Sequence, residues 1–179
     1  MHKKYLDQYD DGNPNEDEGL TDKQISELTA LVGEIIFSFN QLESNLEALI
    51  AEAVNGRSHQ PGYIVVAELT PIFTKKVSVF KAMYGTFVES LNNTELKELF
   101  PKIVGKLYKI KDVRNEVTHA NWLRASQKYE VRLKISNDEK GSYAVRKIIT
   151  PSDLKHRISE IDELLELIER FEELYGNGL

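Results

Sequence analysis

The stretch from Arg114 to Trp122 combines residue types that could act on a phosphate group. Arg114 offers a fixed cation, Asn115 an amide, and His119 an imidazole that can take up or release a proton near neutral pH. If the stretch is helical, Asn115 and His119 lie one turn apart and share a face. Together these groups can hold a phosphate and move a proton, which is the chemistry of phosphodiester cleavage.

The stretch ends a long amphipathic pattern whose apolar residues are Ile103, Leu107, Ile110 and Val117. Continuing that spacing places Arg114 on the apolar stripe, where a guanidinium must be paired or must line a cavity. A purely structural role is the competing interpretation: Arg114 would form an internal salt bridge with Glu43, and His119 would cap or hydrogen-bond near a helix C-terminus.

The stretch resembles the Arg-polar-x-x-x-His signature of the HEPN superfamily, which lies late in the third long helix of those proteins. The expected first helix of this chain, which contains the segment 39–47 with Asn40 and Glu43 beside leucines, is similar to the family's first helix. The resemblance covers roughly residues 20–175. It implies a metal-independent endoribonuclease that needs no cofactor, with RNA as substrate because the 2′-hydroxyl is the internal nucleophile.

The resemblance also implies that two copies of the signature helix meet in a homodimer and form one composite cleft. Arg114, Asn115 and His119 would be its catalytic residues. Supporting roles fall to Glu43 or Asn40, either of which could bond Arg114, and to Glu116, Thr118 and Asn121. The nearby cations are expected to bind substrate: Lys109, Lys111 and Arg124.

Some members of the family are toxins that carry a tyrosine two residues after the histidine, where a partner nucleotidyltransferase modifies it. This chain has Asn121 there, so control by that route is not implied. A toxin or antiviral defence role with an antitoxin or regulatory protein as partner is one expectation. The alternative is a non-catalytic module of the same fold that binds RNA, nucleotides or another protein, which the net charge of −6 favours.

Length, composition and charge limit the classes of protein to which these hypotheses can apply. The chain has 179 residues, enough for one domain, and contains no cysteine; its four histidines are not at metal-ligand spacing. No apolar run could span a membrane, so a cytoplasmic protein is expected. Residues 102–134 hold nine Lys/Arg and three Asp/Glu, a net +6, which leaves −12 for the remainder. Either a solvated helix face with a charged hairpin or an RNA-facing patch explains this segment.

The pattern along the chain predicts four long helices. After a flexible acidic arm over residues 1–20, apolar residues at heptad spacing predict a helix over 22–55. The second helix either has Pro71 in its first turn or is preceded by a separate short helix at 63–69 that ends before Pro71. A third helix runs from Thr94 to about Leu123, with a kink or break at Pro101. The fourth begins at Pro151, after Thr150, and stops at Gly176.

Between the third and fourth helices the period changes to two. Alternation from Tyr129 to Ile135, and again from Tyr143 to Ile149, predicts a β-hairpin at about 127–149. The expected fold is therefore all-α: an up-down four-helix bundle, HEPN-like over residues 21–179, with a small β-hairpin inserted before the last helix.

Overall fold

A computed structural model of the chain describes residues 2–5, 20–55, 66, 70, 72–120, 130–139 and 141–176. The chain divides into two compact units. Unit 1 comprises Met1–Ile36 and Val113–Ile158, and unit 2 comprises Phe37–Asp112 and Ser159–Leu179. Three of the long helices contribute residues to both units.

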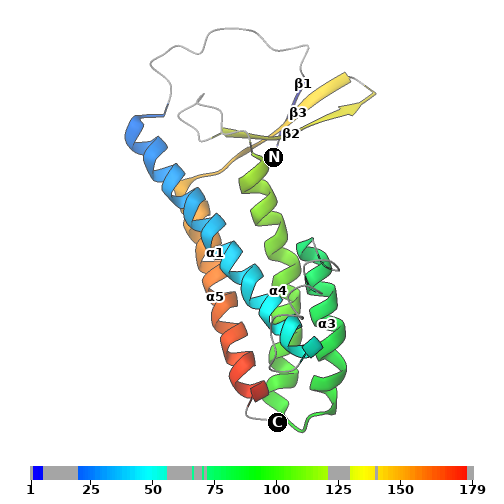
Figure 1. Cartoon of the computed structure of the whole chain (residues 1–179). Helices are drawn as coiled ribbons and strands as arrows, with labels where there is room; N and C mark the ends of the chain where they lie inside the picture. The colour runs from blue at the N-terminus through cyan, green and yellow to red at the C-terminus, as the bar shows by residue number, and fades with distance from the viewer. Residues whose placement is uncertain are drawn as a thin grey trace. The chain divides into compact units, whose positions relative to one another are not determined.

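The described part of the chain is mostly helical, as predicted. Its long helices are α1 (Asp22–Asn55), α3 (Phe73–Ser90), α4 (Thr94–His119) and α5 (Pro151–Gly176), shown in Figure 1. The predicted bounds of α1 and the predicted start and end of α5 are confirmed. Pro101 lies inside α4 without breaking it. The short helix predicted at 63–69 and the extension of α4 to Leu123 lie outside the described residues.

Unit 2 is a four-helix bundle formed by the second half of α1, α3, the first part of α4 and the last part of α5. Each apolar side chain that is fully buried in its core stabilises the fold by about 1.5–3 kcal/mol relative to an exposed one. The core includes an aromatic cluster in which the rings of Phe80 and Phe171 lie 5.7 Å apart. The buried Tyr84 hydroxyl donates a hydrogen bond to the Leu49 carbonyl, 2.8 Å away, so its polar end is satisfied.

The helices of unit 2 do not alternate in direction. In three contacts between α3 and α1, the residue numbers increase along both helices: Phe73 with Phe39, Lys76 with Glu43, and Tyr84 with Leu49. These two helices are therefore parallel. The contacts of α4 run in the opposite order against both α3 (Ser78 with Tyr108, Phe80 with Phe100) and α5 (Glu95 with Arg170, Lys106 with Glu163).

The predicted up-down order is thus wrong, since α1, α3 and α5 share one direction and only α4 opposes them. A connection as long as residues 56–72 permits this order, whereas short loops would make successive helices antiparallel.

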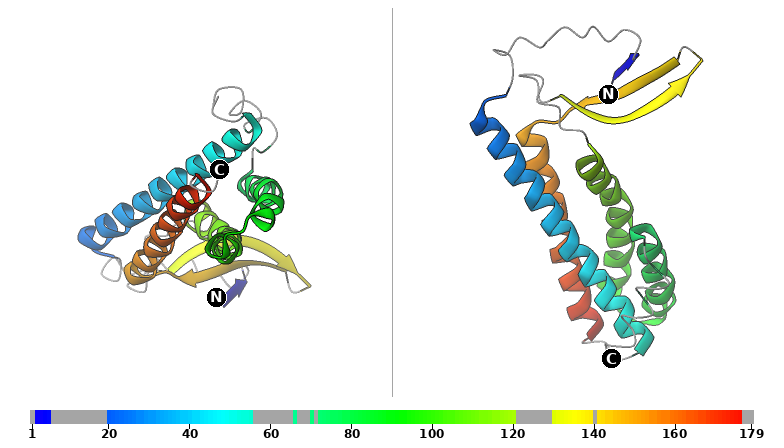
Figure 2. Two further views of the ribbon diagram at one scale, coloured as in Figure 1. Left: turned by 90° about the horizontal axis from the view of Figure 1, so that it is seen from below. Right: turned by 45° about the horizontal axis from the view of Figure 1, so that its top comes forward.

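Unit 1 contains a three-stranded antiparallel sheet with the order β1-β3-β2. The predicted hairpin is confirmed as β2 (Glu130–Asp138) and β3 (Gly141–Ile148), with Gly141 at a φ of +118° after the turn. Figure 2 shows β1 (His2–Tyr5) beside β3. The prediction of a flexible arm over residues 1–20 is therefore wrong for His2–Tyr5, which form a strand. An edge strand is held by backbone hydrogen bonds and needs no apolar pattern.

Side chains cap the N-termini of two helices, α1 and α5. Thr21 and Gln24 exchange hydrogen bonds before α1: the Thr21 backbone N–H donates to the Gln24 amide oxygen at 2.8 Å. Thr150 and Asp153 do the same before α5, with the Thr150 backbone N–H donating to the carboxylate at 2.8 Å. Both pairs are capping boxes, which satisfy backbone donors that a helix start leaves without partners.

Candidate functional site

The last turns of α4 present an exposed polar face. Arg114, Asn115 and Thr118 are exposed on this helix, within unit 1. The Thr118 hydroxyl donates a hydrogen bond to the Arg114 backbone carbonyl at 2.8 Å, and this bond does not involve the Arg114 guanidinium. The structure thus brings three of the predicted site residues onto the surface within about one helical turn.

Arg114 does not lie on the apolar stripe of α4, so that expectation is wrong. Val113 takes the position, with 6% of its surface exposed, and Arg114 is exposed. Residues three and four positions apart lie on the same helix face, so either Val113 or Arg114 could continue the stripe after Ile110. The apolar residue, Val113, is the one that is buried. No hydrogen bond or ion pair joins the Arg114 guanidinium to another residue in the described part of the chain.

The opposite face of α4 packs within unit 1. Val113, Glu116 and Val117 line a small pocket together with residues of β3, the segment after it, and the first turns of α5: Lys147, Ile148, Ile149, Asp153, Leu154 and Arg157. Its volume of about 90 Å³ has room for a few water molecules or a small ion and is well below the size of most ligand sites. At 100° per residue, this packed face is centred opposite Arg114, Asn115 and Thr118.

Glu116 has a defined partner in unit 1. Its carboxylate lies 2.7 Å from the Lys147 ammonium, and the two side chains are 29% and 28% exposed. The pair connects the end of β3 to the turn of α4 that carries the signature residues. Sequence reasoning placed Glu116 near the site but did not find Lys147, because strand residues 31 positions away carry no spacing signal.

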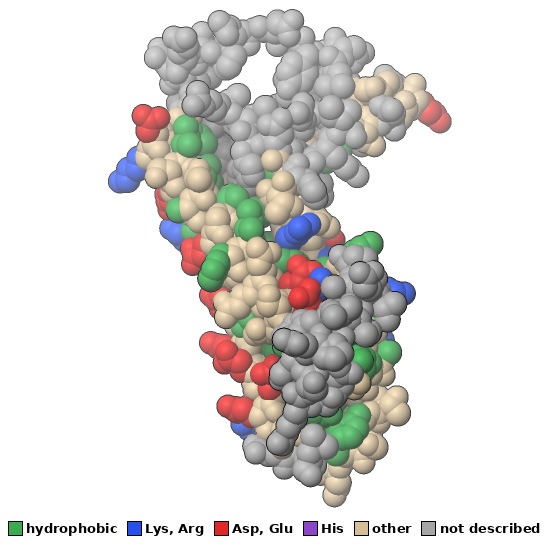
Figure 3. All heavy atoms as spheres, in the orientation of Figure 1, with side chains coloured by type: hydrophobic (Ala, Val, Ile, Leu, Met, Phe, Trp, Pro, Cys, Tyr) green, Lys and Arg blue, Asp and Glu red, His purple; other side chains and the backbone are tan. Residues whose placement is uncertain are grey.

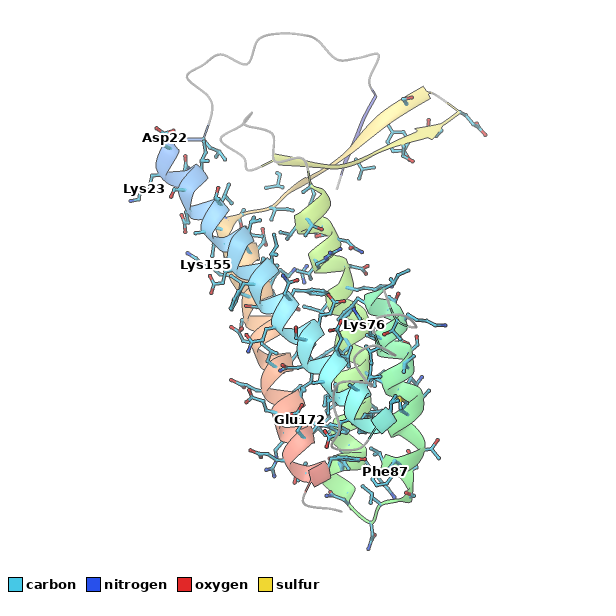
Figure 4. The ribbon with its side chains drawn as sticks, viewed as in Figure 1. Asp22, Lys23, Lys76, Phe87, Lys155 and Glu172 are labelled. Atoms are coloured by element: carbon cyan, nitrogen blue, oxygen red, sulfur yellow. The ribbon has the colours of Figure 1, made fainter. Side chains whose placement is uncertain are left out.

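Glu43, predicted as a supporting residue, belongs to an ion-pair cluster in unit 2. The Lys76 ammonium lies 2.5 Å from the Glu43 carboxylate and 2.7 Å from that of Glu47, and Figure 4 shows the labelled Lys76 on α3. Burial opposes the charge of Lys76, but hydrogen bonds and charges of Glu43 and Glu47 outweigh it and raise the pKa of Lys76. Asn40, the other supporting residue of α1, is exposed.

The remaining predicted residues fall into two groups. Lys109 is exposed and Lys111 half-buried on the part of α4 that belongs to unit 2. His119 is the last residue of α4, so it follows Asn115 by one helical turn, but its side chain is outside the described parts of the structure. Asn121, Trp122 and Arg124 also lie outside the described residues.

Three comparisons with known proteins, against family models, curated sequences and solved structures, found no significant match for this chain. Within the described ranges, no group of three or more His, Cys, Asp or Glu is placed to hold a metal ion. None of the described helices has an apolar stretch long enough to cross a membrane.

Proposed function

We propose that this chain is a metal-independent endoribonuclease of HEPN type, with Arg114, Asn115 and His119 at its active site. The observation that carries this proposal is the exposure of Arg114. A structural role would bury the guanidinium against Glu43, but Glu43 bonds Lys76, and Arg114 faces solvent. A solvent-facing arginine, one residue before an amide and five before an imidazole, is available to a phosphate.

The chemistry assigned to these groups is an internal transesterification. The His119 imidazole would take the proton of the 2′-hydroxyl, which then attacks the adjacent phosphorus and displaces the 5′-oxygen of the next nucleotide. The Arg114 guanidinium would neutralise charge that develops on the phosphate oxygens, and the Asn115 amide would orient them. The products are a 2′,3′-cyclic phosphate and a free 5′-hydroxyl.

One histidine per chain is too few for both proton transfers, since the leaving oxygen also needs a proton. We infer a homodimer in which the exposed face of α4 meets its counterpart and contributes a second His119. The exposure of Arg114, Asn115 and Thr118 supports this arrangement, since the opposite face of α4 is already packed within unit 1.

The test is an RNA cleavage assay with EDTA present. Wild-type protein should produce 2′,3′-cyclic phosphate ends, and His119→Ala should lose at least a hundredfold in rate, since general acid–base catalysis contributes about 10²–10⁴-fold. The matched control is His156→Ala, which removes an exposed imidazole from α5 and should keep full activity. Equal cleavage by His119→Ala and wild type would refute the assignment.

A chain that binds RNA without cutting it is the second candidate, favoured by the basic residues of the sheet in unit 1. Stable RNA binding by wild-type protein with no cyclic phosphate from several RNAs would select it.

A further inference from the structure

The ion pair between Glu116 and Lys147 lies within the last turns of α4, which carry the signature residues. The Glu116 carboxylate and the Lys147 ammonium are 2.7 Å apart. Along α4, Glu116 follows Arg114 by two residues and precedes His119 by three. A shift of the Glu116 turn therefore also moves the residues to which the proposed function assigns catalysis.

Burial distinguishes this pair from the many exposed acids of the protein. Figure 3 shows acidic side chains over α5, and the exposed acids of that helix include Asp162, Glu166 and Glu169. By contrast, only 29% of the Glu116 side chain and 28% of the Lys147 side chain are exposed. Ion pairs at the surface contribute little to stability because water and salt screen them. The Glu116–Lys147 pair is screened less, so its attraction can hold two elements together.

The strand that carries Lys147 has neighbours on both sides. β3 is the central strand of the sheet in unit 1, between β1 and β2, and Lys147 itself pairs with Val131 of β2. Backbone hydrogen bonds to two neighbours restrict a central strand more than an edge strand. Lys147 is therefore a well-anchored partner for the end of α4.

Apolar packing leaves a gap between the same elements. Val113 and Val117 of α4 are buried, but the pocket that they line with Ile149 and Leu154 has a volume of about 90 Å³. Side chains that line a gap lack contact atoms on that side, so they constrain a helix less than a close-packed core does. Glu116 and Lys147 line the same pocket, and their ion pair adds a constraint that the apolar contacts do not supply.

The other charges around this pocket also attract Lys147. Asp153 and Arg157 of α5 line the pocket, so two cations and two anions surround it. Hydrogen bonds from Thr150 lower the pKa of Asp153, and the charges of Lys147 and Arg157 lower it further. The Lys147 ammonium is thus attracted by carboxylates of both α4 and α5, which keeps it in the place where Glu116 meets it.

We propose that Lys147 is a positioning residue: through Glu116 it fixes the last turns of α4 and so holds Arg114 and His119 in place for cleavage. A misplacement of about 1 Å can lower the rate of an enzyme about a hundredfold, so a pair that touches no substrate can still control the rate. The role in cleavage rests on the proposed function, whereas the fixation of α4 on β3 does not.

The experiment compares wild type with Lys147→Gln, Glu116→Gln and the exchanged pair Glu116→Lys/Lys147→Glu. Each single variant removes the attraction, and the exchanged pair restores it with the charges reversed. The matched control is Lys155→Gln, which removes the lysine of another ion pair of unit 1, with Glu27 at 2.9 Å. That pair joins α5 to α1, and its side chains are more exposed, at 61% and 43%.

The first readout is amide hydrogen exchange at residues 115–120, measured by NMR, which requires no cleavage. Exchange should become roughly threefold to tenfold faster in both single variants and return to within about twofold of wild type in the exchanged pair. Lys155→Gln should leave these amides unchanged. Unchanged exchange in Lys147→Gln, or the same increase in Lys155→Gln, would overturn the proposal.

The second readout is RNA cleavage with EDTA present. In the single variants kcat should fall roughly tenfold to a hundredfold while KM changes less than about threefold, because misplaced groups slow the chemical step more than they weaken binding. The exchanged pair should recover most of kcat. Single variants with the kcat of wild type would overturn the positioning role. If wild-type protein cleaves no RNA, the proposed function fails, and hydrogen exchange then decides whether Lys147 fixes α4.

Discussion

Lys76 is a charged side chain held almost fully inside unit 2, with 6% of its surface exposed. Its ammonium neutralises two carboxylates, Glu43 and Glu47, that are themselves only 25% and 30% exposed. Lys76→Met would leave both acids without a cation, and we expect a loss of about 2 kcal/mol in the free energy of unfolding, measured by urea denaturation.

The control for Lys76 is Glu43→Gln, which leaves the lysine paired with Glu47 and should cost less than about 1 kcal/mol. The raised pKa of Lys76 means that the stability from its charge is present below the unfolded lysine pKa and is lost as the pH rises through the folded pKa. Lys76→Met should therefore remain less stable than wild type from pH 7 to pH 9. A variant as stable as wild type would show that the cluster contributes no net stability.

The signature residues show how far sequence reasoning reaches at the scale of one side chain. It found the polar residues at the end of α4, because residue types and helical spacing are visible in the chain. It placed Arg114 on the wrong face, because Val113 and Arg114 both fit the spacing and only packing decides between them. It missed the Glu43–Lys76 pair because ion pairs between different helices depend on how the helices pack and on their relative direction.

At the scale of elements, the start of α5 depends on the exchange of hydrogen bonds between Thr150 and Asp153. Asp153→Ala should lower the free energy of unfolding by roughly 0.5–1 kcal/mol at pH 7, because the helix start loses its cap and its compensating negative charge. Hydrogen bonds from the Thr150 backbone and side chain lower the pKa of Asp153. The stability from this carboxylate is thus present above its unfolded pKa and lost as the pH falls through the folded pKa.

The difference between wild type and Asp153→Ala should accordingly shrink in titrations below pH 4, measured by thermal unfolding. Asp162→Ala is the control, since it removes an exposed carboxylate farther along the same helix. A deficit equal at pH 7 and at pH 2 would show that the effect does not depend on the ionised carboxylate of Asp153.

Helix and strand patterns predicted most elements but not how they connect. Heptad spacing specified α1, because a long buried stripe leaves a periodic signal. Two features of the fold left no periodic pattern in the sequence. The parallel packing of α3 on α1 depends on a connection longer than a tight turn, and β1 pairs through its backbone with a polar sequence, HKKY. Both come from tertiary pairing, which acts after local preferences are satisfied.

At the scale of the whole molecule, the proposed function depends on charge and on the proposed self-association. Under the proposed function, a chain of net charge −6 would approach RNA through a local basic surface, and its single His119 would need a second His119 for two proton transfers.

The composite site makes a quantitative prediction for mixed dimers. If each site needs His119 from both chains, wild type mixed with an equal amount of His119→Ala and allowed to exchange should keep about one half of its activity per wild-type chain, because random pairing puts half of those chains in inactive dimers. Activity should stay unchanged when the two proteins are combined immediately before the assay, since no exchange has occurred. Cleavage rates are measured with EDTA at fixed wild-type concentration. Undiminished activity after full exchange would mean that each chain cuts RNA alone, and the second proton would then have to come from another group within the same chain.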